Sequence, residues 1–439
     1  MLKARTEWAK LKMEEGQVKR FELHYGVVLM VRTKRFLSAM DRIGRNRLSK
    51  PVAWGLLYLM PVAAAMAFLL FINVFRAFLS PRGAQVASGI VSLGPLANLG
   101  IPGLNPYIPI IYGWIALVVG MVVHEGAHGV VARSLGLPVK NSGLILFLFV
   151  IPIGAFVDID ESVLKQAKRS QSARVLAAGA GTNFVLAVVC LLLLTSIVGS
   201  MTPAVNGAGI TSVSQGYPAY ERGVMPGDIV TAVNGKPVTD LSTILGENTT
   251  FKAGQALNFT IYRNGQTIEI DNITLVCCDK ITDTTTNKTL ASWPVIGVAS
   301  ISEESLRSAV SAYSNVLNNP LVYIGCIPTL NLGNCAQMVP FTNSESVFYA
   351  SPLGSALIPA TNILYWMFFL NFNLAIFNSL PIYPLDGGQA FRVGVEALGK
   401  GKFSEQRVSK ITTAVTAGVL FFLLGIIIGP YVYVYVFGG

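Results

Sequence analysis

The chain alternates long apolar runs with shorter polar and basic stretches. An α-helix needs roughly 20 mainly apolar residues to cross a bilayer. Runs of about that length recur along the chain, and this pattern predicts a polytopic α-helical membrane protein with about five spans. The predicted spans are residues 51–78, 107–132, 175–198, 358–377 and 411–436.

Residues 143–157 depart from this pattern. The segment is apolar, but it is short, contains glycine and proline, and is rich in β-branched and aromatic residues. Non-helical backbone is tolerated at membrane depth only where protein or a wet cavity covers it. We therefore predict a re-entrant β-hairpin that packs against the protein and offers an open strand edge to a peptide. A plain interfacial loop is the alternative.

Residues 201–300 carry the turn and strand signals of a β-domain. A Pro-Gly-Asp turn at 226–228 precedes one apolar run, and Asn-Gly pairs stand at 234–235 and 264–265 between alternating segments. Asn-Gly is a strong signal for a tight β-hairpin. We predict an inserted β-domain between the third and fourth spans, followed at 301–355 by a partly apolar segment without an assigned role.

The composition also indicates a membrane protein. Of the 439 residues, 52% are hydrophobic and 13% are charged, about half the charged share of ordinary soluble proteins. The net charge of +10 does not indicate nucleic acid, because the basic residues lie beside the apolar runs, as in cytoplasmic loops. They cluster in residues 1–50, 165–174 and 392–410. We expect a cytoplasmic N-terminus, an extracytoplasmic segment at 201–355 and no nucleic-acid partner.

Cysteines and sequons are compatible with an extracytoplasmic segment at 201–355. Four of the five cysteines lie there, and Cys326 with Cys335 is the preferred disulfide, with free thiols as the alternative. The segment also carries Asn-x-Thr sequons, which are glycosylated only on the exported side, although a Thr-rich stretch produces them by chance. The sequons begin at Asn248, Asn258, Asn272 and Asn287.

The second predicted span contains the pattern His124-Glu125-x-x-His128. Positions i and i+4 share one face of a helix, so both imidazoles can bind the same zinc ion. Glu125 then lies beside them as a general base for a water molecule. Two buried structural histidines are the alternative, but polar groups inside a span are rare and usually functional.

A catalytic zinc site needs a third protein ligand besides the two histidines. The best candidate is Asp386, which follows the fourth span in a stretch rich in proline and glycine. Such a stretch interrupts a helix and can direct the carboxylate inward. The predicted topology places Asp386 at a depth similar to that of His124 and His128. A turn aspartate at a helix end is the alternative.

The zinc motif together with the Asn-x-x-Pro-x-x-Pro-Leu-Asp-Gly run at 378–387 resembles the site-2 protease family of intramembrane zinc metalloproteases. The resemblance implies that His124, His128 and Asp386 bind Zn²⁺ and that Glu125 is the catalytic acid and base. It also identifies residues 143–157 with the family's membrane-embedded β-loop. Asn183 matches a Gly-Pro-x-x-Asn-like element in which alanine replaces proline. Its role is either a hydrogen bond to the oxyanion or substrate, or helix packing.

Residues 216–238 resemble part of a PDZ domain. PDZ domains bind extended peptide tails by strand addition. The resemblance therefore implies a PDZ-like domain that binds substrate tails, and a structural β-domain without a ligand is the alternative.

Together these features predict a polytopic membrane protein with a re-entrant hairpin and an inserted PDZ-like β-domain. The expected function is zinc-dependent cleavage of transmembrane or juxtamembrane segments of membrane-anchored substrates, as in regulated intramembrane proteolysis. Membrane lipid is the expected surrounding. An inactive peptide-binding scaffold and a metal transporter are the alternatives. The predicted regions are a basic cytoplasmic segment (1–50), a membrane domain with the zinc motif and hairpin (51–200), the PDZ-like domain (201–300), a linker (301–355) and a second membrane segment with the Leu-Asp-Gly motif (356–439).

Overall fold

The computed structural model describes residues 21–25, 27–98, 100–149, 151–246, 249–276, 294–314, 344–399 and 402–437. The chain divides into two compact units. The first comprises Met1–Cys190 with Trp366–Gly439, and the second comprises Leu191–Tyr365. The preferred disulfide, Cys326 with Cys335, lies outside the described residues, as do the sequons at Asn248 and Asn287.

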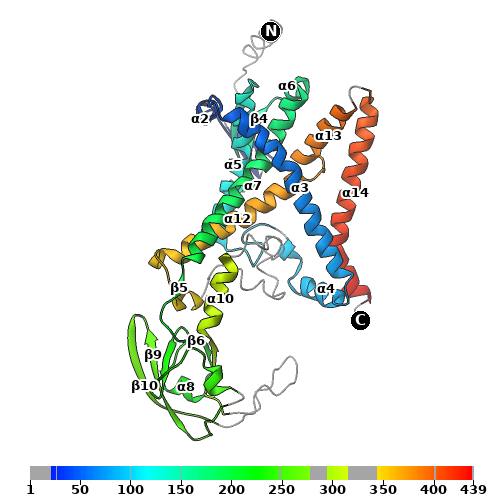
Figure 1. Cartoon of the computed structure of the whole chain (residues 1–439). Helices are drawn as coiled ribbons and strands as arrows, with labels where there is room; N and C mark the ends of the chain where they lie inside the picture. Colours follow the sequence, from blue (N-terminus) through cyan, green and yellow to red (C-terminus); the bar gives the residue numbers. More distant parts are fainter. Residues whose placement is uncertain are drawn as a thin grey trace. The chain divides into compact units, whose positions relative to one another are not determined.

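Five helices of the described chain are long and apolar enough to cross a membrane, which confirms the predicted number of spans. Their bounds lie within a few residues of the apolar runs, because apolar side chains along a helix need lipid or protein around them. They are α3 (Ser49–Phe78), α5 (Ile110–Ser134), α7 (Arg169–Gly199), α12 (Leu357–Ser379) and α14 (Glu405–Val432), drawn in Figure 1.

Shorter helices join these spans. Among them, α2 packs on α5 at two glycines: a Cβ at Gly129 would lie 2.6 Å from Met40 Sδ, and a Cβ at Gly44 would lie 3.1 Å from Val130 O. This close approach fixes α2 against the helix that carries the zinc motif. The short helices of the first unit are α2 (Leu37–Gly44), α4 (Gly83–Ser92), η1 (Pro95–Asn98), α6 (Glu161–Gln166), α13 (Asp386–Leu398) and η6 (Tyr433–Phe437).

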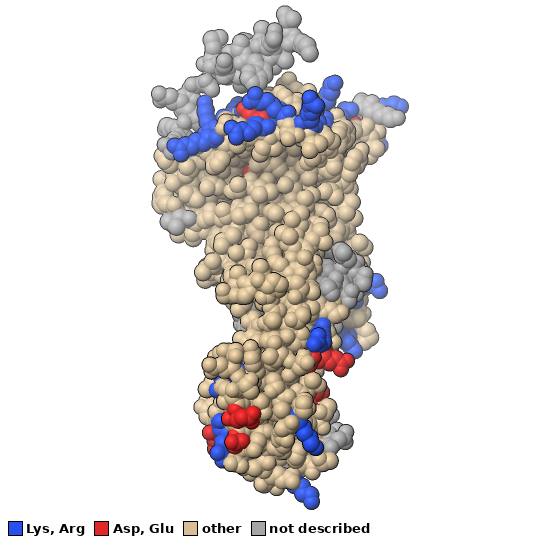
Figure 2. Space-filling view, turned by 60° about the vertical axis from the view of Figure 1, so that its left-hand side comes forward, with Lys and Arg blue, Asp and Glu red and all other residues tan. Residues whose placement is uncertain are grey.

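Basic residues gather where α3, α7 and α14 begin and where α5 ends. Figure 2 shows Lys and Arg along one rim, above a belt with almost no charged side chains on that face. A belt without charge is the surface that a bilayer requires.

The first unit contains an antiparallel sheet in the order β1-β2-β3-β4. The hairpin predicted at 143–157 forms its second half, with β3 (Val139–Phe147) paired to β4 (Ile151–Ile159). Sequence analysis missed the first half, in which β1 (Phe21–His24) and β2 (Val28–Thr33) come from the basic N-terminal segment. In this order β1 and β4 are the edge strands.

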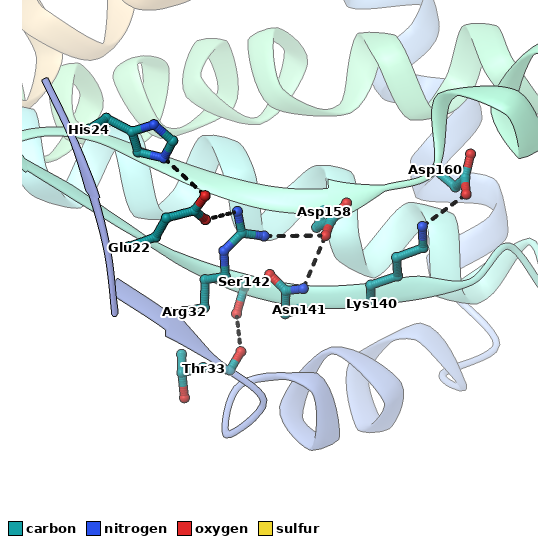
Figure 3. A network of polar contacts seen from close by, with 9 residues as sticks. All are labelled: Glu22, His24, Arg32, Thr33, Lys140, Asn141, Ser142, Asp158 and Asp160. Atoms are coloured by element: carbon teal, nitrogen blue, oxygen red, sulfur yellow. Dashed lines mark hydrogen bonds and ion pairs between the residues drawn. The ribbon is translucent and has the colours of Figure 1, made fainter. Parts of the chain in front are cut away.

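Polar side chains connect the strands at one end of this sheet (Figure 3). Arg32 donates to Glu22 at 2.8 Å and lies 3.8 Å from Asp158, which also accepts from Asn141 at 3.0 Å. Nearby, Asp160 accepts hydrogen bonds from Ser162 and from Lys140, and these bonds lower the pKa of its carboxyl group. The β3–β4 turn at the other end is apolar and exposed.

The second unit contains a six-stranded sheet in the order β10-β9-β7-β6-β11, with β8 paired to β7. Both predicted Asn-Gly hairpins are confirmed, and Asn234 and Asn264 adopt positive φ angles of 50° and 51°, as tight hairpin turns require. The strands are β6 (Ala208–Val213), β7 (Ile229–Val233), β8 (Lys236–Pro237), β9 (Ala256–Arg263), β10 (Gln266–Thr274) and β11 (Val298–Ile301).

Apolar side chains and one ion pair hold this second sheet together. Ile210, Val230 and Phe259 are fully buried in its core. Asp228, only 1% exposed, accepts two hydrogen bonds from Arg263 at 2.6 and 2.7 Å. The remaining elements of the unit are α8 (Pro218–Glu221), α9 (Ser242–Leu245), α10 (Glu303–Ser314), η4 (Ser344–Phe348), η5 (Gly354–Ala356) and the pair β5 (Thr202–Pro203) and β12 (Tyr349–Ala350).

Candidate active site

α5 brings the three residues of the zinc motif together. His124 and His128 are each 8% exposed, and their ring centroids lie 4.9 Å apart on one face of the helix. One ligand atom from each of His124, Glu125 and His128 lies within 4.8 Å of the others. The i, i+4 spacing therefore produces the cluster that the sequence predicts.

Asp386 completes this cluster from a distant part of the chain. Its Oδ2 lies 3.0 Å from Nε2 of His124 and 3.1 Å from Nε2 of His128. Asp386 is the first residue of α13, and the chain before it folds back on the next two residues. A Cβ at Gly387 or Gly388 would lie 2.4 Å from backbone atoms of Leu380 or Ile382, so only glycine permits this turn.

These donors fit a zinc ion. Two imidazole nitrogens and a carboxylate oxygen are a ligand set of catalytic zinc, which keeps a fourth position for water. With bonds of about 2.1 Å, tetrahedral zinc separates neighbouring donor atoms by about 3.4 Å, a few tenths of an ångström more than the two nitrogen–oxygen distances here. The geometry thus needs only a small adjustment to receive the ion.

Helix α7 supports the ring of His128 and leaves space beside it. The Nδ1 of His128 lies 2.7 Å from the carbonyl oxygen of Val175 and must donate to it, because a carbonyl only accepts. A neutral ring then has its lone pair on Nε2, the atom that faces Asp386. A Cβ at Gly179 would lie 2.5 Å from Nε2 of both histidines. The absence of a side chain at Gly179 therefore keeps the metal position open.

Asn183, also on α7, contacts the other histidine. It is fully buried, and its Nδ2 lies 3.3 Å from Nδ1 of His124 while its Oδ1 has no hydrogen-bond partner in the described chain. The oxygen and nitrogen of an amide are exchangeable assignments. Turning this amide places Oδ1 beside Nδ1, which carries the proton when Nε2 faces a metal. In this orientation the Nδ1–H of His124 donates to Oδ1 of Asn183.

Glu125 contacts the sheet. Its Oε2 accepts a hydrogen bond of 3.1 Å from the backbone N–H of Val157 on β4. The edge strand and the carboxylate are therefore in direct contact. All five residues singled out in the sequence, namely His124, Glu125, His128, Asn183 and Asp386, meet in this one region.

A profile of peptidase family M50 matches residues 112–424, well over half of the chain, with the zinc motif and Asp386 inside the match. The chain belongs to peptidase family M50. This M50 peptidase is a zinc metalloprotease, and its apolar helices make it an integral membrane protein.

Relatives of this M50 peptidase include proteins of archaea and bacteria. An uncharacterized protein of Methanocaldococcus jannaschii is 23% identical over 381 residues, which cover 86% of this chain and 80% of that protein. Zinc metalloprotease RasP of Shouchella clausii is 27% identical over 236 residues, covering 51% and 50%. RasP of Oceanobacillus iheyensis is 26% identical over 231 residues, covering 52% and 51%. The match to each RasP protein thus spans about half of its length.

Sequence analysis gave no role to three supporting groups of this M50 peptidase: Gly179, which lies in the element that ends at Asn183, the carbonyl of Val175 and the N–H of Val157. Two of them are backbone groups, for which a sequence carries no direct signal. Gly179 had a signal, since a glycine four residues before Asn183 on the same helix face can mark a close approach.

Proposed function

We propose that this M50 peptidase hydrolyses peptide bonds within or beside transmembrane segments of membrane-anchored proteins. The observation that carries the proposal is the meeting of His124, His128 and Asp386 between helices long enough to span a bilayer, with Glu125 alongside. Soluble substrates have no access to such a depth, whereas a substrate in the same membrane does.

In the proposed site, Nε2 of His124, Nε2 of His128 and Oδ2 of Asp386 hold the zinc ion. When bound, zinc supplies a Lewis acid that polarises the scissile carbonyl group. Val175 orients the ring of His128 through its carbonyl, and Asn183 orients the ring of His124 through its amide oxygen. The buried position of Asn183 supports this role over a direct contact with substrate.

Glu125 moves the protons of the reaction. It takes a proton from the attacking water, whose oxygen bonds to the carbonyl carbon, and delivers the proton to the nitrogen of the breaking C–N bond. In the structure its carboxylate is bonded to the N–H of Val157. A substrate that adds as a strand to the edge of β4 competes for that N–H and releases the carboxylate for this step.

The finer placement in the membrane is part of the proposal. The basic residues at the ends of α3, α5, α7 and α14 support a cytoplasmic N-terminus and an extracytoplasmic second unit. The exposed apolar turn of β3 and β4 supports re-entry of the sheet into the bilayer. Reactive cysteines at Ser170 and Lys236, both exposed, test the sidedness, because only the cysteine at Lys236 is expected to be labelled from outside.

The second unit is proposed to act as a PDZ-like module that selects substrates by their external parts. Its confirmed hairpins and edge strand β11 support strand addition of a peptide tail. Replacing residues 208–301 by a short linker is expected to preserve zinc binding and cleavage of a short substrate helix. The same change is expected to relax discrimination against substrates with large external domains. Loss of cleavage in a folded, zinc-loaded protein would contradict a purely selective module.

Peptide cleavage by purified Glu125→Gln protein tests the main proposal. The variant is expected to retain zinc and to lose about 10²–10⁴-fold in kcat, the usual effect of removing a general acid and base. Glu396→Gln, the same change on the surface of α13, is the matched control and should retain full activity.

A scaffold contains no zinc, and a transporter moves metal across vesicles, so zinc content and metal flux separate the two alternatives from a protease. Unchanged cleavage by Glu125→Gln would refute the proposed mechanism.

A further inference from the structure

The first unit contains a cavity of about 800 Å³ between α2, α3, α5 and the four-stranded sheet. Glu125 and Gly126 line it from α5, Ala39 and Ile43 from α2, and Phe156 from β4. The zinc-binding histidines are not among its lining residues. The cavity therefore adjoins the site at the general base.

The lining of this cavity is almost entirely apolar. Glu125 is the only charged residue among the described residues that line it. An anion that enters such a space loses its hydration and meets only the like charge of Glu125. A cation can pair only with Glu125, the group that must stay free for proton transfer, whereas an apolar group gains by leaving water. The chemistry of the walls therefore favours an uncharged, apolar occupant.

Two of the walls, α2 and α5, are packed on each other, and the cavity is larger than a single side chain requires. The close approaches of Gly129 to Met40 and of Gly44 to Val130 hold α2 on α5. A cavity of roughly 150 Å³ is enough for benzene, so the volume here suits several apolar side chains. That is the size of a short peptide segment.

The position of Glu125 determines which part of a substrate reaches this cavity. Because Glu125 delivers its proton to the nitrogen of the scissile bond, the residue that contributes this nitrogen must lie next to Glu125. The space beside Glu125 is the cavity, and β4, where it borders this space, can hold the same segment as an added strand.

We infer that the cavity is the specificity subsite for the residues that follow the scissile bond, and that it accepts extended segments of uncharged, bulky apolar residues. This inference rests on the proposed function and deepens it. It predicts a preference set by side-chain size and charge on the amine side of the bond, independent of the second unit.

Gly126 offers a way to fill the cavity without disturbing its surroundings. A Cβ at Gly126 meets no atom within 4 Å, and replacing glycine in a helix by leucine improves helix propensity. Gly126→Leu therefore places a side chain in the cavity. Gly418→Leu is the matched control, because Gly418 on α14 is exposed, also has no atom within 4 Å of its Cβ, and does not line the cavity. Ala39→Phe fills the cavity from α2, at an exposed residue.

The test uses the full-length, zinc-loaded protein and substrate helices that carry Phe, Leu, Ala or Lys after the scissile bond. In the wild-type protein, Lys is expected to lower kcat/KM at least about 100-fold relative to Leu. Gly126→Leu and Ala39→Phe are expected to lower the ratio of kcat/KM for Phe over Ala about tenfold or more, and Gly418→Leu is expected to leave it unchanged. If both Gly126→Leu and Ala39→Phe leave the Phe-over-Ala ratio unchanged, the inference is overturned. If Gly126→Leu protein does not fold, the result for Ala39→Phe alone is decisive.

Two further measurements separate the remaining outcomes. Binding of the same peptides to Glu125→Gln protein does not depend on turnover. A size preference in binding without any cleavage by the wild-type protein therefore contradicts the proposed reaction but supports the subsite. Native mass spectrometry detects a retained lipid. A lipid that is lost in Gly126→Leu protein, with unchanged peptide preference, assigns the cavity to a lipid chain and overturns the inference.

Discussion

The two β-sheets of this protein have the same antiparallel construction and opposite surroundings. In the six-stranded sheet of the second unit, apolar residues such as Ile210 and Phe259 are fully buried. In the four-stranded sheet of the first unit, Ile153 on β4 is 51% exposed, and Phe149 in the β3–β4 turn is 52% exposed. Apolar burial stabilises a fold against water, and apolar exposure is favourable only where lipid replaces water.

This difference in the burial of apolar side chains suggests that the two regions have different roles. The second sheet has its own apolar core and its own buried ion pair. Among the described residues the first sheet has no such separate core. It packs on α5 and α2, and its strand β4 contacts Glu125. We expect substitutions in the first unit to change zinc binding and cleavage, and substitutions in the core of the second unit to change only its stability. The following experiments test this expectation.

The largest expected effect is the loss of zinc in Asp386→Ala protein. The change removes one of three protein donors, and zinc affinity is expected to fall by about 100-fold or more, since even indirect supporting groups account for 10–100-fold. The second sheet should retain its stability. Competition with a chelating dye measures the affinity, and Asp160→Ala, an acidic residue outside the cluster, is the control. Undiminished zinc binding would remove Asp386 from the site.

The next effect concerns the core of the second sheet. Arg263→Met leaves the buried carboxylate of Asp228 without its partner, which is expected to cost about 3 kcal/mol of unfolding free energy. Adding Asp228→Asn to the same protein should recover part of this loss, because the unpaired charge is removed. Thermal unfolding of the second unit measures both changes, and zinc affinity should stay constant. A parallel loss of zinc would show that the two regions are energetically coupled.

A matched pair of substitutions tests the surroundings of the two regions directly. Ile153 on β4 and Met225 in the second unit are 51% and 53% exposed. Arginine at position 153 is expected to cost about 2–4 kcal/mol if the side chain lies near the middle of the bilayer. Arginine at position 225 should stay within about 0.5 kcal/mol, as for most surface sites in water. Equal effects at both positions would contradict a re-entrant sheet.

The smallest effect lies at the polar end of the first sheet. Hydrogen bonds from Ser162 and Lys140 lower the pKa of Asp160, so its stabilising contribution is present above the pKa of an unfolded carboxyl, about 4, and is lost as the pH falls below that value. Asp160→Asn is expected to cost about 0.5 kcal/mol at pH 7, because the group is near the surface. The difference between the two proteins, measured by thermal unfolding, should shrink toward pH 3. A difference that grows on acidification would reverse the assigned sign.

Much of the site could be predicted because its signals are local. The spacing of His124 and His128 depends only on the pitch of a helix, and each span depends only on the length of an apolar run. Asp386 required a longer inference. The basic clusters beside the apolar runs gave the topology, and the topology placed Asp386 at the same membrane depth as His124 and His128. The two Asn-Gly turns likewise follow from residues that tolerate positive φ.

Tertiary structure decided the features that depend on contacts between distant segments. β2 pairs with β3 only when the N-terminal segment meets a hairpin more than one hundred residues away. Likewise, β11 pairs with β6, which lies some ninety residues earlier in the chain. Gly179 matters because two histidines of another helix face it, and Val157 because its N–H points at Glu125. The sequence by itself determined which atoms can bind zinc and which helices can enter a membrane. Packing determined how those atoms are aimed, because the orientation of a ring or carboxylate is set by neighbours that only the folded chain brings within hydrogen-bonding distance.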